Sequence, residues 1–340
     1  MGRSERGRGL VLRLAVSGDG GVGIAFLYVA PVSLAGWWFG RRVGLAVALT
    51  CLGLYILGIA VHPVALPVAS TVVRGAVLVA AALLAAELAS RTRRLTQTAG
   101  ELDAIRQALT PSAIPALPGL DVAVQFTPAE HGVSGDFYLL TNGPHGTNVA
   151  IVGDVCGHGP VAAQRATFAR ATLASVAASS DDPVEILKLV NDVLTDRWND
   201  GNFLTATCIV HDPRAQSARI ANAGHPPPIR LSDLSKINGG GPALGIILRA
   251  QFTSRRVALV PPEGLLVYTD GLLDARAIRG ELYGEQRLIE ELSRCAARPV
   301  GEIVESLSQS VSRFAGRALP DDVCIMALRS TPLDAPRSLP

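Results

Sequence analysis

Four aspartates stand where β-strands are expected to begin or end, and this placement suggests metal chemistry. Asp136 lies in VSGDFYLL, Asp154 ends the apolar run VAIVGD, and Asp270 ends LLVYTD before Gly271. Asp321 precedes the apolar run VCIMALR. Carboxylate oxygens are the ligands that Mg²⁺ and Mn²⁺ prefer, so strand ends that meet at one edge of a sheet pair would form a site without His or Cys. A single acid at a strand end is more often a turn former, and the hypothesis rests on the four together.

The turn VCGHG and a second histidine motif, AGHPPP, hold the other candidate side chains. Cys156 is not expected to be a nucleophile, because no anion-binding loop with a closing arginine surrounds it. His158 is a candidate accessory proton donor, or else an ordinary turn histidine. His225 is expected to fix its loop. Gly157 and Gly271 could let the backbone approach a metal closely, although glycine also suits a plain turn.

Apolar and alternating runs predict the elements that must position these residues. Strands are predicted at 121–127, 136–141, 147–154, 203–211, 216–223, 252–260, 264–269 and 322–329, and helices at 160–178, 183–198, 285–296 and 300–316. The strands come in clusters, with pairs of helices between the clusters. This order predicts an α+β domain with antiparallel sheets and outer helices, not a βαβ alternation.

Composition and charge exclude several classes of protein. The chain of 340 residues is 49% hydrophobic and 18% charged, and its apolar residues are concentrated before residue 90. After Arg94 there are 21 Lys and Arg residues against 26 Asp and Glu residues, and this acidic balance argues against nucleic-acid binding. The five cysteines are widely spaced, without a CxxC pair, so neither a disulfide framework nor a thiolate zinc site is expected.

The first 90 residues predict a membrane region. The runs Gly20–Gly40 and Val43–Val61 contain no charged residue, and each is long enough to cross about 30 Å of hydrocarbon. A third run, Val64–Ala86, carries only Arg74. About three transmembrane helices are therefore predicted in 1–90, with a number between two and four and either N-terminal orientation left open.

Residues 91–112 predict a helical stalk that links the two regions. Leu88, Leu95, Leu102 and Leu109 recur every seven residues, which favours either a homodimer through this helix or a monomeric connector packed on its own domain. The prolines of PSAIPALPG end the helix. The catalytic domain is then predicted at 113–330 and a disordered tail at 331–340.

Eight segments, in order, resemble the metal-dependent PPM-type (protein phosphatase 2C-like) Ser/Thr phosphatases, in the bacterial branch of stage II sporulation and stress-response regulator phosphatases. The segments are RQALTPSAIPALPGLDVAVQFTPAEHGVSGDFY, VGDVCGHGPVAAQRA, FLTATCIVHDP, ANAGHPPPI, PALGI, LLVYTDGLLDARA, YGEQRL and DDVCIMAL. Cys156 stands where the family commonly has serine, and Ser134 and Leu139 also depart from its pattern. None of these changes removes a carboxylate.

The resemblance implies a site and a fold. It assigns Asp136, Asp154, Asp270 and Asp321 as catalytic metal-site carboxylates, and the backbone carbonyl of Val155 as a further ligand. It implies an αββα sandwich, in which two antiparallel sheets are flanked by helices. It further implies two divalent cations, Mn²⁺ or Mg²⁺, which share an activated water.

The function implied is a membrane-anchored Ser/Thr phosphatase whose catalytic domain faces the cytoplasm. The substrate implied is a phosphorylated regulatory protein of the anti-anti-sigma type. The alternative is a catalytically silent signalling scaffold that binds a phosphorylated partner in the same pocket. A transporter is disfavoured, because the predicted spans offer no polar pathway.

Overall fold

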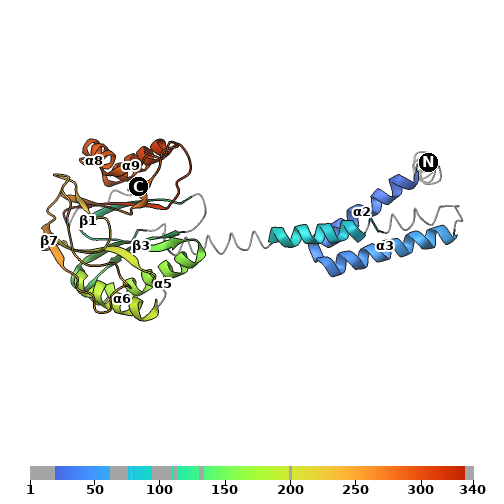
Figure 1. Ribbon diagram of the computed structural model, residues 1–340, viewed down its shortest axis with the longest axis horizontal. Helices are drawn as coiled ribbons and strands as arrows, with labels where there is room; N and C mark the ends of the chain where they lie inside the picture. Colours follow the sequence, from blue (N-terminus) through green and yellow to red (C-terminus); the bar gives the residue numbers. More distant parts are fainter. Residues whose placement is uncertain are drawn as a thin grey trace. The chain divides into compact units, whose positions relative to one another are not determined.

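The computed structural model describes residues 20–61, 76–77, 79–93, 109, 114–129, 134–198 and 201–333. The chain divides into two compact units, Met1–Glu101 and Leu102–Pro340 (Figure 1). The tail predicted at 331–340 lies outside the described residues from 334 onward.

The N-terminal unit is helical, with α2 at Gly20–Phe39, α3 at Arg41–Val61 and helical residues at 79–93. Small residues let these helices approach closely: a Cβ on Gly44 would lie 2.7 Å from the Cα of Gly36, and one on Gly36 would lie 2.7 Å from the Ala82 carbonyl oxygen. Arg93 donates to the carbonyls of Trp37 and Trp38, each at 2.8 Å, and so satisfies acceptors in the last turn of α2.

The predicted membrane spans are not supported by these helices. Helices α2 and α3 occupy the two charge-free runs of the sequence. Across the part of the chain that the structure describes, however, none of the helices combines the length and the apolarity needed to cross a membrane. Residues 62–75, which include much of the third run, lie outside that part.

The predicted stalk falls mostly on residues that the structure does not describe, including Leu95 and Leu102. Leu88 is half exposed, whereas Leu109 is only 2% exposed and packs into the core of the C-terminal unit. Leu109 therefore packs against the chain's own C-terminal domain, and its place in the heptad pattern does not reflect contact with a second copy.

Two antiparallel sheets form the centre of the C-terminal unit. The four-stranded sheet has the order β1-β9-β8-β6, and the five-stranded sheet has the order β2-β3-β4-β5-β7. The strands of the first are β1 Leu120–Thr127, β6 Ile229–Arg230, β8 Gly264–Tyr268 and β9 Val323–Ser330. Those of the second are β2 Ser134–Asn142, β3 Asn148–His158, β4 Leu204–Asp212, β5 Ser217–Ala223 and β7 Ser254–Ala258.

Two helices cover each outer face, which confirms the predicted α+β sandwich (Figure 1). Helices α5, Pro160–Ala177, and α6, Pro183–Arg197, pack on the five-stranded sheet. On the four-stranded sheet, α9, Val300–Ala315, packs on β1 and β9, and α8, Gly284–Cys295, packs beside α9 in the same core. Helix α6 begins where sequence rules predict, because the Asp182 carboxylate accepts from Val184 N and proline follows the cap.

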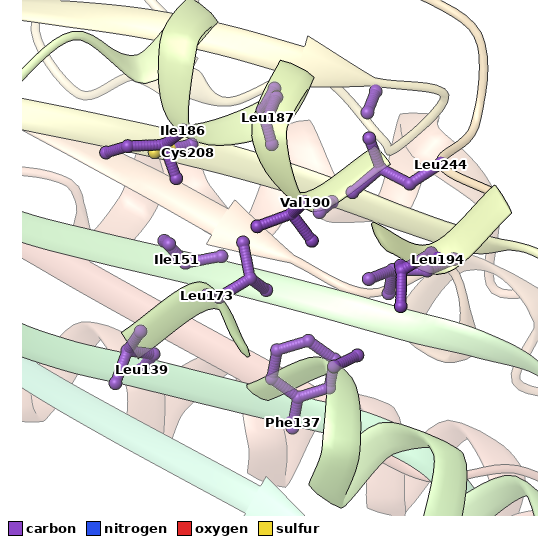
Figure 2. Packing of buried hydrophobic residues seen from close by; sticks show 14 of the residues in the cluster. Phe137, Leu139, Ile151, Leu173, Ile186, Leu187, Val190, Leu194, Cys208 and Leu244 are labelled. Atoms are coloured by element: carbon purple, nitrogen blue, oxygen red, sulfur yellow. The ribbon is translucent and has the colours of Figure 1, made fainter. Parts of the chain in front are cut away.

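Strands β2 to β5 of the five-stranded sheet are largely buried on both faces, whereas the edge strand β7 is mostly exposed. Phe137 and Leu139 of β2 point into the core beneath α5 and α6, whereas Tyr138 and Leu140 belong to the core between the sheets. Figure 2 shows Phe137 and Leu139 beside Leu173 of α5. The alternation is the period of two that a strand imposes, and each large side chain buried in this way contributes about 1.5–3 kcal/mol.

The sequence placed most elements within a few residues but mistook one strand end. Strand β3 continues past Asp154 to His158. Val155, which is fully buried, pairs with Leu204, so the glycines of VCGHG do not end the strand there. The two-residue β6, the short helix α7 at Gly271–Asp274 and the 3-10 turn η1 at Pro144–Gly146 are too short for a periodic signal.

Candidate functional site

Asp136 and Asp154 face each other on neighbouring strands. They are partners in the antiparallel register of β2 and β3, and Asp136 is 3% exposed. Burial, followed by the charge of Asp154, raises the pKa of Asp136 well above its usual range. Burial also raises the pKa of Asp154 to about 7. The two carboxyl groups are also hydrogen-bonded to each other, so the pair shares a proton.

Asp270 and Asp321 come from the other sheet. Asp270 follows β8 and caps α7, where its carbonyl accepts from the N–H groups of Leu273 and Asp274 at 2.8 and 2.9 Å. Asp321 precedes β9. Both side chains are open to solvent, and partial burial is the largest of the causes that raise their pKa values. Each also contributes charge that raises the pKa of Asp154, so acids from both sheets act on one another.

Two glycines allow the backbone to approach closely at this site. A Cβ on Gly135 would lie 2.0 Å from the carbonyl oxygen of Val155, and one on Gly271 would lie 2.1 Å from that of Asp322. No side chain fits at either position. Gly157 has a φ of +97°, a left-handed conformation that favours glycine. Sequence reasoning selected Gly157 and Gly271 but missed Gly135.

Asp322 is a site residue that sequence reasoning did not assign. It is 3% exposed, and its carboxylate accepts from Ala129 N at 2.6 Å. Its charge raises the pKa values of Asp136 and Asp154. The signal available in the sequence was the doublet of Asp321 and Asp322. Adjacent side chains at the start of a strand point in opposite directions, so one of the two acids was bound to point inward when the other is exposed.

The turn after Asp154 holds the histidine and the thiol that the sequence singled out. His158 ends β3 opposite Ser134, and its charge lowers the pKa of Asp321, so it lies beside the acids. The Cys156 sulfur accepts from Phe203 N at 3.2 Å and lies 3.6 Å from Asn202 Oδ1. These contacts give Cys156 a structural role, because they hold the segment before β4 against the turn.

His225 fixes its loop, as the sequence suggested. Its N–H donates to Asn222 Oδ1 at 2.8 Å, and Asn222 Nδ2 donates to the His225 carbonyl at 2.8 Å. Its ring Nδ1 lies 2.8 Å from the hydroxyl of Thr205, the residue opposite Asp154 on β4. Burial lowers the pKa of His225 to about 3, so the ring is neutral. His225 thus supports the strand beside the acids and does not touch the open side of the site.

The donor set suits a hard divalent cation. The carboxylates of Asp136, Asp154, Asp270 and Asp321 offer oxygen, and the Val155 carbonyl lies against the β2 backbone next to them. Within the described ranges, no three Asp, Glu, His or Cys side chains are already grouped as a ligand set for a metal ion. The acids therefore raise one another's pKa values without forming a finished coordination shell. A bound cation would offset this mutual repulsion.

Comparison with known proteins places this domain. The model of the family described as stage II sporulation protein E matches residues 144–331, which is more than half of the chain. Protein IcfG from Synechocystis sp. is 27% identical over 255 residues, covering 66% of this chain. The match covers 40% of IcfG, so this chain spans less than half the length of that relative.

Solved structures share the fold. The RsbU and RsbW domains of Rv1364c from Mycobacterium tuberculosis superpose with a TM-score of 0.58 at 24% identity, covering 66% of this chain and 64% of that one. The SiaA PP2C domain of Pseudomonas aeruginosa gives 0.56 at 22% identity, with 62% and 86% covered. The PP2C phosphatase domain and regulatory fragment of SpoIIE from Bacillus subtilis give 0.54 at 19%, with 62% and 63% covered.

Proposed function

Because this chain belongs to the stage II sporulation protein E family of metal-dependent serine/threonine protein phosphatases, we propose that it hydrolyses phosphoserine or phosphothreonine on a regulatory protein. The observation that carries the proposal is the carboxyl pair of Asp136 and Asp154, which face each other with raised pKa values among further acids from the second sheet. Structural acids in a salt-bridge network would instead have lowered pKa values, since basic partners favour the charged form.

The residues proposed to hold two divalent cations, Mn²⁺ or Mg²⁺, are Asp136, Asp154, Asp270, Asp321 and the carbonyl of Val155. When bound, such ions supply a water of lowered pKa and neutralise charge on the transferring phosphoryl group. Asp136 and Asp154 must lose their shared proton to act as ligands. Because burial raises the pKa values of both groups, release of a proton is expected to accompany cation binding.

The remaining residues position the substrate and move protons. His158 lies beside Asp321 and is exposed, so it is placed to donate a proton to the leaving oxygen. No residue of the chain is required as a covalent nucleophile, in line with the structural contacts of Cys156. Gly271 lets the segment after Asp270 pack closely against the Asp322 backbone, and Gly157 adds no side chain to the exposed turn before His158.

The proposed substrate is a phosphorylated regulator of the anti-anti-sigma type. Two similar structures support this direction, because one joins RsbU and RsbW domains in a single protein and the other is described as a cell fate determinant. The whole-protein activity stays a proposal, since the chain covers less than two thirds of its first relatives.

Hydrolysis assays separate the enzyme from the silent scaffold. The purified full chain with Mn²⁺ or Mg²⁺ is expected to release phosphate from phosphoserine and phosphothreonine peptides. Asp154→Asn and Asp270→Asn are expected to lower the rate by at least about 100-fold, the scale at which loss of one electrostatic group acts. Asp121→Asn, at an exposed position of β1, serves as the control and should retain the rate. Binding of the phosphopeptides without turnover would favour the scaffold.

The predicted location is the cell membrane with the catalytic domain in the cytoplasm. It stays a prediction, and fractionation of cells that express the full chain tests it. Recovery in the membrane fraction after a salt wash is the expected result. Recovery with the freely dispersed proteins would contradict it.

A further inference from the structure

A small hairpin with an apolar tip follows the Asp270 segment. Arg276 and Leu282 form a bridge, Ala277 N donates to the Glu281 carbonyl at 2.9 Å, and Gly280 N donates to the Ala277 carbonyl at 2.8 Å. Its tip residue Ile278 is 76% exposed. The hairpin is thus closed by its own backbone, yet it presents an apolar side chain to solvent.

The base of the hairpin is held rigidly on α9. Tyr283 is 2% exposed, and its ring meets that of Phe314 edge to face at a centroid distance of 5.4 Å. Its hydroxyl lies 2.9 Å from the Ser310 hydroxyl. Ile278 also lies over Gly316, where an added Cβ would be 3.5 Å from Ile278 Cδ1. The hairpin therefore meets the segment that leads from α9 to Asp321.

Basic side chains gather on these two segments. Arg276 and Arg279 of the hairpin and Arg317 of the neighbouring segment are exposed. In the described ranges, no ion pair or side-chain hydrogen bond engages any of the three, whereas the hairpin's Glu281 pairs with Arg287 at 3.6 Å. No acid occurs between residues 306 and 320. This basic surface stands on a part of the chain that is otherwise acidic.

The basic surface adjoins the proposed site through short lengths of chain. Arg317 precedes Asp321 by four residues, so at most about 14 Å of chain separates them. Arg276 follows Asp270 by six residues, or at most about 22 Å. The contact of Gly271 with the Asp322 backbone joins the two segments at their inner end. These spans keep the basic surface within reach of a protein whose phosphorylated residue enters the proposed site.

We propose that Arg276, Ile278, Arg279 and Arg317 form a docking surface for the acidic face of the phosphorylated substrate protein, with Ile278 as its apolar contact. The proposal rests on the proposed function and names what the same site recognises beyond the phosphoryl group. Charge complementarity selects the occupant, because unpaired arginines around an apolar tip favour acidic side chains next to the phosphorylated residue. The surface acts on binding and not on the chemical step.

The test compares phosphorylated substrates that have acidic residues next to the phosphorylated residue with substrates that do not. The probes are a phosphothreonine peptide flanked by Glu, the same peptide flanked by Lys, and p-nitrophenyl phosphate. The triple variant Arg276→Glu, Arg279→Glu and Arg317→Glu is expected to raise KM for the acidic peptide by about tenfold, the lower bound of electrostatic steering effects, with kcat unchanged. Turnover of p-nitrophenyl phosphate should be retained. Ile278→Ser, which leaves the charges in place, should raise the same KM by less.

The matched control is Arg214→Glu, Arg249→Glu and Arg255→Glu, which changes the net charge equally at three other exposed arginines. An equal rise in KM with this control, an unchanged KM in the triple variant, or an equal loss of p-nitrophenyl phosphate turnover would each overturn the docking surface. If the unmodified chain hydrolyses none of the probes, the proposed function fails. In that case, binding of the acidic peptide to the same variants still decides the docking surface.

Discussion

Asp136 and Asp154 lie directly opposite each other on β2 and β3, two antiparallel strands joined by the short turn η1. Neighbouring strands hold residues of one register pair about 4.5–5.5 Å apart, so the two carboxyl groups share a site whenever the sheet is formed. Acids from the second sheet complete the group, which ties the chemistry to the packing of both sheets.

Removing the charge of Asp154 is expected to stabilise the metal-free protein at neutral pH. The pKa of Asp154 is about 7 in the folded chain, against 3.8 for an ordinary aspartate. The folded state therefore binds more protons than the unfolded state between these values, and stability present below about pH 4 is lost as the pH rises through 7. Thermal unfolding of Asp154→Asn in EDTA should show a higher Tm than the wild type at pH 8.

The gain is expected to be on the order of 2–4 kcal/mol, because one pKa unit corresponds to 1.36 kcal/mol. At pH 4 the two proteins should unfold at similar temperatures. Adding Mn²⁺ should reverse the order at pH 8, since only the wild type keeps the full carboxylate set. A lower Tm for the variant in EDTA at both pH values would show that the surroundings of Asp154 do not raise its pKa.

Gly135→Ala is expected to damage the site through the backbone. The new Cβ would lie 2.0 Å from the Val155 carbonyl oxygen, so the two strands must separate. Destabilisation of about 1–3 kcal/mol is expected, together with weaker Mn²⁺ binding. Urea unfolding and a Mn²⁺ titration measure the two effects. Gly301→Ala in α9 is the control, because no atom lies within 4 Å of its Cβ, and this variant should gain up to about 1 kcal/mol.

Asp322 is expected to act as a tether, in contrast to Asp321. Asp322→Asn keeps an oxygen to accept from Ala129 N, whereas Asp322→Ala leaves that donor without its acceptor. The alanine variant should lose about 1–3 kcal/mol of stability, more than the asparagine variant. Asp321→Asn should do the reverse, with a large loss of phosphatase activity and little change in stability. Equal effects of Asp321→Asn and Asp322→Asn on both readouts would contradict this division of roles.

His225 is expected to make the fold sensitive to acid. Its pKa is about 3 in the folded chain and 6.5 when unperturbed, so the unfolded state binds more protons between these values. Stability from the neutral ring is therefore present above pH 6.5 and lost as the pH falls toward 3. His225→Gln should flatten the dependence of urea stability on pH over this interval. Burial also lowers the pKa of His211 to about 4, so a smaller dependence of stability on pH should remain in the variant. An unchanged slope would show that His225 is not buried as described.

Most of the fold follows from sequence periodicity, because long strands and helices have to bury one or both faces. Leu139 and Ile151 lie in the apolar runs from which β2 and β3 were predicted, and Figure 2 shows them packed beneath the helices. The N-terminal spans were predicted from apolarity alone, and no helix of the described residues supports them.

The site was predicted from the sequence less completely than the fold. The four aspartates were identified because each adjoins an apolar run, and the structure brings them within electrostatic reach. Gly135 and Asp322 were missed, since a close backbone approach and a buried second acid depend on how distant strands meet. Asp154 was placed at a strand end, although β3 continues to His158. Pairing with β4 decided this, and no local pattern in the sequence records it.

The most direct test of the account is a crystal of the full chain soaked in Mn²⁺ and measured for anomalous scattering at the manganese edge. Two peaks are expected next to the Val155 carbonyl, between the carboxylates of Asp136, Asp154, Asp270 and Asp321. Peaks only at other acids of the surface, in crystals of a protein that releases phosphate with Mn²⁺, would contradict it.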